Sequence, residues 1–124
     1  MTTWTSDELT RIGSAEEMEI ASRRVDGTLR KARTIWVVRD GDDLYVRSVN
    51  GVTSGWYRGT RARHEGRVDA DGVDRDVTFV DVGEEVDDRL DAAYRAKYRR
   101  YAGSIIDAIT SPAARAATIK LVPR

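Results

Sequence analysis

Residues 34–49 read Thr-Ile-Trp-Val-Val-Arg-Asp-Gly-Asp-Asp-Leu-Tyr-Val-Arg-Ser-Val, and this stretch decides the fold class. A mainly apolar run leads into the dipeptide Asp40-Gly41, after which Leu44, Val46 and Ser48 share one face of a second run. Asp-Gly readily adopts the positive φ angles that a tight hairpin turn requires. The stretch therefore predicts two antiparallel β-strands, over 34–39 and 44–49, joined by a short turn.

Two more Asp-Gly dipeptides repeat this arrangement. Asp26-Gly27 follows an alternating segment, Asp71-Gly72 joins segments 67–70 and 73–82, and a last alternating segment covers 117–122. A sheet of five or six such strands leaves the fewest unpaired edges when it curls into a barrel. We therefore expect an α+β, mainly β fold, with about six antiparallel strands in a barrel and helices at its periphery.

Capping residues mark two short helices near the ends of the chain. Thr5 and Glu8 are expected to form a capping box. In this motif the Thr5 hydroxyl accepts a hydrogen bond from the Glu8 backbone N–H, and the Glu8 carboxylate accepts one from the Thr5 backbone N–H. Trp4 is expected to anchor this helix to the core, and Gly13 is expected to end it as a left-handed C-cap. Ser111-Pro112 predicts a second helix start, because proline is favoured at the first helical position.

The longest predicted helix covers residues 86–101. Acidic residues lie in its first half and basic residues in its second half, which suits the helix dipole. Apolar and amphipathic residues follow one broad stripe at helical spacing, which is expected to pack against the barrel. The stripe consists of Val86, Leu90, Ala93, Tyr94, Lys97 and Tyr101.

Composition excludes several classes of function. The 124 residues suffice for one domain, over 1–124, and the 21 basic and 21 acidic residues give no net charge to attract nucleic acid or an anionic membrane. No apolar run is long enough to span a membrane, and the absence of cysteine fits a reducing cytoplasm. The single histidine, His64, is interpreted as a surface C-cap of a short helix, so neither a metal site nor a histidine-based catalytic centre is expected.

Residues 44–63 are the best candidate for a binding site. A strand brings Arg47, Ser48 and Asn50 to a turn, and a short helix follows that begins after Thr53 or Ser54 and ends at Gly66. The amides of Gly55 and Trp56, with Ser54 at the cap, form a candidate anion cradle. Arg58 and Arg61 are three residues apart, so they share a helix face and are placed to close on a phosphate.

The aromatic pair Trp56-Tyr57 adds a flat surface to this candidate site. Such rings are suited to covering either a planar ligand or one end of a barrel. The alternative interpretation makes Trp56 part of the core and the neighbouring arginines an ordinary solvated helix face. Spacing alone leaves both interpretations open.

The segments Ser48-Val49-Asn50-Gly51 and Gly55-Trp56-Tyr57-Arg58-Gly59 resemble split-barrel flavoproteins, most closely the deazaflavin-dependent nitroreductases. Across nearly all of its length the chain is similar to domain of unknown function 2255, a small bacterial family of that group. The nitroreductase turn usually reads Ser-Lys-Gly-Gly, so Val49 replaces its lysine, and Arg47, Arg58 or Arg61 would substitute for it. The resemblance implies a split barrel and a homodimer with a flavin groove between subunits.

Two functions follow from this resemblance. In the first, the protein binds FMN or a deazaflavin and acts as an oxidoreductase on a small organic substrate, with the cofactor ring near Thr34 and Trp36. In the second, it is a non-catalytic split-barrel dimer that binds another small ligand or none. No residue is expected to act as a catalytic acid or base, because the hydride chemistry would belong to the cofactor.

Overall fold

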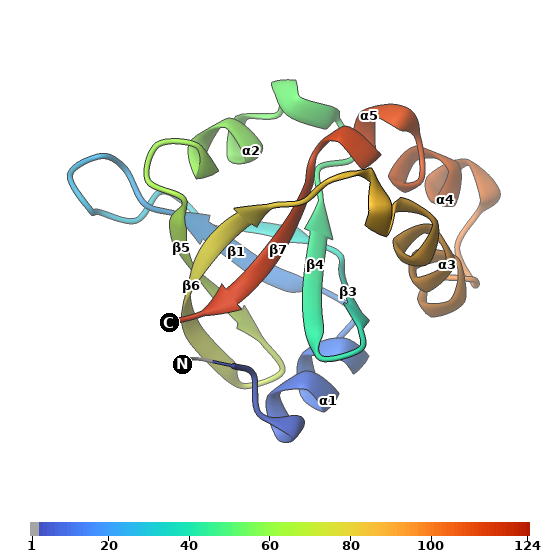
Figure 1. Ribbon diagram of the computed structural model, residues 1–124, viewed down its shortest axis with the longest axis horizontal. Helices are drawn as coiled ribbons and strands as arrows, with labels where there is room; N and C mark the ends of the chain where they lie inside the picture. Colours follow the sequence, from blue (N-terminus) through green and yellow to red (C-terminus); the bar gives the residue numbers. More distant parts are fainter. Residues whose placement is uncertain (1–2) are drawn as a thin grey trace.

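The computed structural model describes residues 3–124. Seven antiparallel strands form one sheet that curls into a nearly closed barrel, with helices at its ends and along one side (Figure 1). The strand order across the sheet is β2-β1-β5-β6-β7-β4-β3. The strand bounds are β1 Met18–Ser22, β2 Arg33–Ile35, β3 Val37–Asp40, β4 Asp43–Arg47, β5 Glu65–Ala70, β6 Val73–Asp81 and β7 Thr118–Pro123. The predicted mainly β barrel is confirmed, with seven strands in place of about six.

The last strand along the chain lies in the middle of the sheet. β7 pairs with β6 on one side, where Leu121 faces Phe79, and with β4 on the other, where Ile119 faces Val46. The strand predicted over 117–122 is therefore confirmed, and it joins the half-sheet β2-β1-β5-β6 to the hairpin β3-β4 (Figure 1).

Trp36 separates the two edge strands of the sheet. The sequence predicted one strand over 34–39, but β2 pairs with β1 whereas β3 pairs with β4, so the two halves of this run lie on opposite edges. The prediction of one continuous strand was wrong because β2 and β3 are the two edge strands of the sheet. The chain passes from one edge strand to the other at Trp36, where the curled sheet brings its two edges close together. We call this break at Trp36 the seam.

The predicted hairpin turns are present. In the turn between β5 and β6, Asp71 (φ 46°) and Gly72 (φ 81°) both adopt left-handed conformations, as a type I′ turn requires. Gly66 is not the predicted helix cap, because it lies within β5, where a Cβ atom would come within 2.3 Å of the Ala21 carbonyl oxygen. The preceding helix, α2, Gly55–Thr60, ends with Arg61 as its C-cap, so His64 is not the predicted cap. His64 lies in the turn between α2 and β5 with a left-handed backbone (φ 56°), and it donates its backbone N–H to the Thr60 carbonyl at 2.9 Å.

The helix α1, Ser6–Ser14, covers one end of the barrel and begins with the predicted capping box. Trp4 is confirmed as a structural anchor, because its buried indole Nε1–H donates to the Leu121 carbonyl at 3.0 Å. Gly13 was wrongly predicted as a left-handed cap. It lies inside the helix, beside the side chain of Arg39 on β3, and extended Ala15 ends the helix.

A second core lies outside the barrel wall, under α3, Asp87–Lys97. Val86, Leu90 and Tyr94 of the predicted stripe are buried there against β3 and β4. The helix is shorter than predicted, because Tyr98 leaves the helical conformation and becomes its C-cap. After it come α4, Gly103–Ile109, which was not predicted, and α5, Pro112–Ala116, which Ser111 caps as predicted. No helix within 3–124 is long and apolar enough to cross a membrane.

Candidate functional site

A groove of about 280 Å³ opens at the seam of the barrel, and we call it the seam groove. Trp36 comes from the seam itself, Trp56 from α2, Gly55–Thr60, and Ile109 from α4. Its full lining is Thr34, Ile35, Trp36, Arg47, Val49, Trp56, Ile105 and Ile109. The fold thus brings together Thr34, Trp36, Arg47 and Trp56, four residues that the sequence analysis placed in the site.

Trp36 is held rigidly in the groove wall. Its indole ring stacks on the ring of Tyr98 at a centroid distance of 3.7 Å and an interplanar angle of 2°, and Tyr101 lies 4.9 Å away. The Tyr98 hydroxyl donates to the Glu16 carbonyl at 2.8 Å, which fixes the stack between α3 and the loop before β1. A side chain packed in this way offers a planar ligand a surface that needs little reordering.

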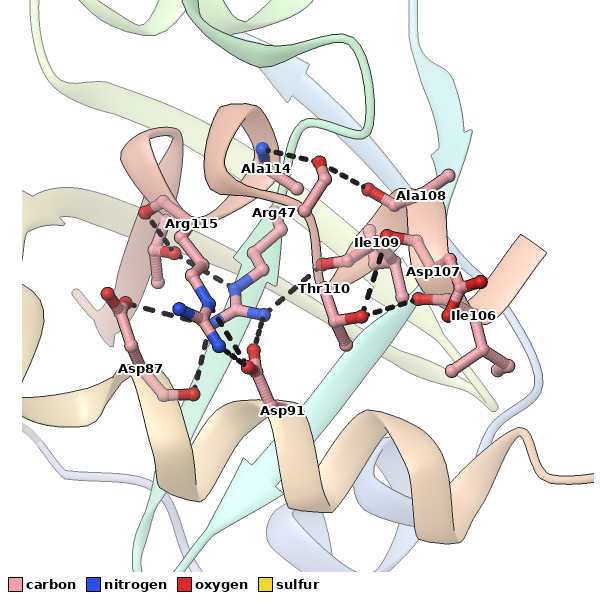
Figure 2. A network of polar contacts seen from close by, with 12 residues as sticks. Arg47, Asp87, Asp91, Ile106, Asp107, Ala108, Ile109, Thr110, Ala114 and Arg115 are labelled. Carbon is pink, nitrogen blue, oxygen red and sulfur yellow. Dashed lines mark hydrogen bonds and ion pairs between the residues drawn. The ribbon is translucent and has the colours of Figure 1, made fainter. Parts of the chain in front are cut away.

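Arg47 forms the charged floor of the groove, and other protein groups already compensate its charge. Its Nη1 donates to Asp91 at 2.6 Å and to the Ile109 carbonyl at 3.2 Å, and its Nε donates to Thr118 at 3.0 Å (Figure 2). Burial alone would raise the pKa of Asp91, but hydrogen bonds from Arg115 and Arg47 outweigh burial and lower that pKa. Arg47 therefore ties β4 to α3, α4 and β7.

The residues of the predicted anion cradle do not converge on one point. Ser48 is buried and donates its hydroxyl to the Gly51 carbonyl at 2.8 Å, at the start of the short helix η1, Gly51–Thr53. Asn50 is exposed, and the Ser54 side chain makes no hydrogen bond to the start of α2. These three residues shape the turn between β4 and α2.

The two predicted phosphate-binding arginines lie on α2 and at its end, outside the seam groove. Arg61 pairs with Asp81 and lies 5.7 Å from the ring of buried Tyr57. Arg58 is exposed and has no hydrogen bond or ion pair from its side chain to any other part of the described chain. Neither arginine lines the groove.

A second cavity, of about 260 Å³, lies on the other side of Trp56, and we call it the basic pocket. Four cationic side chains and no carboxylate line it, together with the N-terminal end of α2. The lining consists of Ile20, Ser22, Arg24, Arg30, Lys31, Arg33, Gly55, Trp56 and Thr60. This pocket was not predicted from the sequence, although the basic run over 30–33 directly before Thr34 is a signal for it.

Arg30 is the unusual member of the basic pocket. Its Nε atom is buried and has no hydrogen-bond partner among residues 3–124. The side chain lies against Gly59 of α2, where an added Cβ would be 3.1 Å from the Arg30 Nε and 2.7 Å from the Ser22 hydroxyl. A buried N–H without an acceptor is costly, so this arrangement is suited to an anion that completes it.

Within the described part of the chain, no cluster of three or more histidine, cysteine, aspartate or glutamate residues is arranged to hold a metal ion.

The two cavities meet at Trp56, which lines both. One cavity is mainly apolar with aromatic walls and the other is cationic. Together they are suited to a ligand with a planar ring and an anionic tail.

The fold is shared with solved structures of low sequence identity. An F420 reductase is 15% identical, with a TM-score of 0.63 over 94% of this chain and 90% of that chain. A putative pyridoxamine 5′-phosphate oxidase from Listeria innocua is 17% identical, with a TM-score of 0.64 over 94% and 90%. The heme storage protein HutZ from Vibrio cholerae is 12% identical, with a TM-score of 0.60 over 96% and 89%. These likenesses confirm the split-barrel fold.

No curated protein matches the chain. A family model described as an uncharacterized protein conserved in bacteria matches residues 8–121, which is nearly the whole barrel with its helices. The family expected from the sequence is therefore confirmed, and the chain belongs to the DUF2255 family.

Proposed function

We propose that this protein binds a phosphorylated flavin or deazaflavin, such as FMN, and acts as an oxidoreductase on a small organic substrate. The ring would lie in the seam groove against Trp36 and Trp56, near Thr34, and the phosphate would lie in the basic pocket. The single observation that carries the proposal is the buried, unpartnered Nε of Arg30 in a pocket lined by cations, next to the aromatic groove.

The residues present fit such a cofactor on both sides of Trp56. The groove supplies flat apolar surfaces for a ring, and Arg30, Lys31 and Arg33 supply charge-assisted donors for phosphate oxygens. The cofactor would supply the hydride chemistry. The groove lining contains no carboxylate and no histidine, so the chain's own contribution is to bind the ring, orient it and exclude water.

Structural neighbours that bind such cofactors support this cofactor class. They include the F420 reductase, an FAD-binding protein from Mesorhizobium loti, and an FAD- and heme-binding protein from Mycobacterium smegmatis. Heme iron in proteins is held by His, Cys, Met or Tyr side chains. None of these residue types lines the seam groove, so its chemistry favours a flavin-type ring over heme.

We further propose that the protein is a homodimer whose second subunit covers the groove. Val49 and Ile105, which line the groove, are 46% and 45% exposed, and Val52, three residues after Val49 in the chain, is 49% exposed. Large apolar side chains clustered on a surface favour burial in an interface. A partner subunit over them would narrow the groove and remove its ring-binding surface from water.

The test is a binding titration of the cofactor-free protein with riboflavin, FMN and a deazaflavin. We expect FMN to bind more tightly than riboflavin, and the Arg30→Ala substitution to weaken FMN binding about tenfold or more, because a charged hydrogen bond contributes about 1.5–3 kcal/mol. Arg58→Ala is the matched control, since this exposed arginine lines neither cavity, and it should leave binding unchanged.

Equal affinity for riboflavin and FMN would contradict the phosphate role of the basic pocket. If none of the three compounds binds, the non-catalytic split barrel becomes the better description. If Arg58→Ala removes the FMN preference and Arg30→Ala does not, the phosphate binds at the cradle predicted from the sequence and not in the basic pocket.

A further inference from the structure

A chain of aromatic rings leads from the seam groove to the protein surface. Trp36 lines the groove, and Tyr101 lies next to it, with ring centroids 4.9 Å apart. Tyr98 stacks on Trp36 at 3.7 Å and lies 6.0 Å from Tyr101. Rings at these separations are in direct contact or nearly so, which is close enough for an electron to pass between them.

The outer end of this chain has a proton acceptor. The Tyr101 hydroxyl donates to a carboxylate oxygen of Glu16 at 2.6 Å, and Arg100 pairs with the same carboxylate. The guanidinium of Arg100 also lies 5.2 Å from the centre of the Tyr101 ring. A cation in this position opposes a positive charge on the ring, so a phenol that loses an electron here must also release its proton, and Glu16 is placed to receive it.

The other tyrosines of the cluster lack such an acceptor. The Tyr98 hydroxyl donates to backbone carbonyls, that of Glu16 at 2.8 Å and that of Val37 at 3.3 Å. The Tyr94 hydroxyl is buried and has no hydrogen-bond partner in the described chain. Burial raises the pKa of both phenols, and the hydrogen bond to Glu16 raises the pKa of Tyr101, so Tyr101 differs from them by its carboxylate partner. Tyr101 is therefore the tyrosine of this cluster that is suited to one-electron oxidation.

We propose that Trp36, Tyr101 and Glu16 form a path that carries one oxidising equivalent out of the seam groove to the protein surface. A one-electron oxidant in the groove, such as a photoexcited isoalloxazine ring, takes one electron from the Trp36 indole. Tyr101 returns one electron to Trp36 and passes its phenolic proton to the Glu16 carboxylate. The oxidant has then gained one electron, Tyr101 is a neutral radical, and Glu16 carries the proton.

The source of the oxidant rests on the proposed function, but the path belongs to the chain and is testable without a cofactor. In pulse radiolysis, the azide radical oxidises tryptophan in preference to tyrosine and becomes azide. We expect the tryptophan-radical absorption of the wild-type chain to decay into tyrosyl-radical absorption, at a rate that does not depend on protein concentration. Tyr101→Phe should abolish this conversion, and Glu16→Gln should slow it.

Tyr94→Phe is the matched control, because Tyr94 belongs to the same aromatic cluster and has no proton acceptor, and it should leave the conversion unchanged. Trp36→Phe should suppress it. Conversion that persists in Tyr101→Phe, or that is lost equally in Tyr94→Phe, would overturn the proposal. Failure of flavin binding with an intact conversion would contradict the proposed function alone.

Discussion

Arg30 and Gly59 show how one missing methyl group organises the candidate site. Gly59 lies within α2, and the space that its Cβ would fill is occupied by the Arg30 side chain and the Ser22 hydroxyl. Alanine is the better helix former, so selection for stability alone would favour Ala at this position by about 1 kcal/mol. Glycine is explained by the position of Arg30 in the basic pocket.

The Gly59→Ala substitution should therefore displace Arg30 while leaving its charge in the protein. We expect the preference for FMN over riboflavin to fall about tenfold, since the charged hydrogen bond from Arg30 loses its geometry. Equilibrium dialysis against both compounds measures this change. Gly103→Ala is the control, because among the described residues a Cβ added at Gly103 would have only its own chain neighbours and helix backbone within 4 Å. An equal loss of the FMN preference in both variants would count against the role of Arg30.

Lys97 is a residue whose charge is unfavourable in the folded protein. Its ammonium group donates to the Val37 carbonyl at 2.6 Å, and burial lowers its pKa to about 8 from the usual 10.5. Below pH 8 the lysine is protonated in both the folded and the unfolded chain. Above pH 8 the unfolded chain binds a proton that the folded chain lacks, so the free energy of unfolding should rise with pH.

This rise should end near pH 10, where the tyrosines of the unfolded chain ionise. Burial raises the pKa of Tyr98 above its usual value of 10.0, so this phenol opposes the lysine effect from that point upward. Urea unfolding between pH 7 and pH 11 would measure the profile. Lys97→Met should remove the rise between pH 8 and pH 10 and keep the fall at higher pH.

At the scale of elements, α3 is held to the barrel by a stripe of large side chains. Leu90 is fully buried between α3 and the β3–β4 hairpin. Leu90→Ala should lower the free energy of unfolding by about 2–5 kcal/mol, because the substitution leaves a cavity in a core that cannot fully collapse. Thermal unfolding measures the loss. Arg95→Ala, at an exposed position of the same helix, should change stability by less than about 0.5 kcal/mol.

The elements that could be predicted from the sequence are those specified by neighbouring residues. Asp71-Gly72, the Thr5–Glu8 capping box and Ser111-Pro112 act within a few residues, and each is present as expected. The break at Trp36 could not be predicted in this way, because it depends on which strands pair with β2 and β3 across the sheet. Periodicity within 34–39 carries no information about those distant partners.

In the candidate site, too, some residues could be predicted from the sequence and others depend on contacts between distant segments. Thr34, Trp36 and Trp56 were predicted for the site, and the fold brings them into one groove. The basic pocket was missed because its cations come from the segment after β1, while the surface that positions Arg30 comes from α2. The basic run over 30–33 is visible in the sequence. The pocket forms only where α2 packs against this segment, and that packing has no local pattern in the sequence.

At the scale of the whole molecule, the proposed homodimer is tested by its mass in solution. Light scattering should give a mass near twice the 13.9 kDa of one chain. Ile105→Glu should shift the protein toward monomer, because it would place a charge in the proposed interface. A mass of one chain for the wild type, at concentrations that support flavin binding, would show that the groove does not need a partner.

The central position of β7 has a consequence for how the chain acquires its shape. Until residues 118–123 are synthesised, β6 and β4 present unpaired edges, and the two parts of the sheet have no strand between them. Ribosome-bound chains that stop before β7 are thus exposed to edge-to-edge association with other nascent chains. Closure must join segments distant in sequence, such as Val46 and Ile119, which slows folding. The nascent barrel therefore closes only after β7 has been synthesised and has left the exit tunnel.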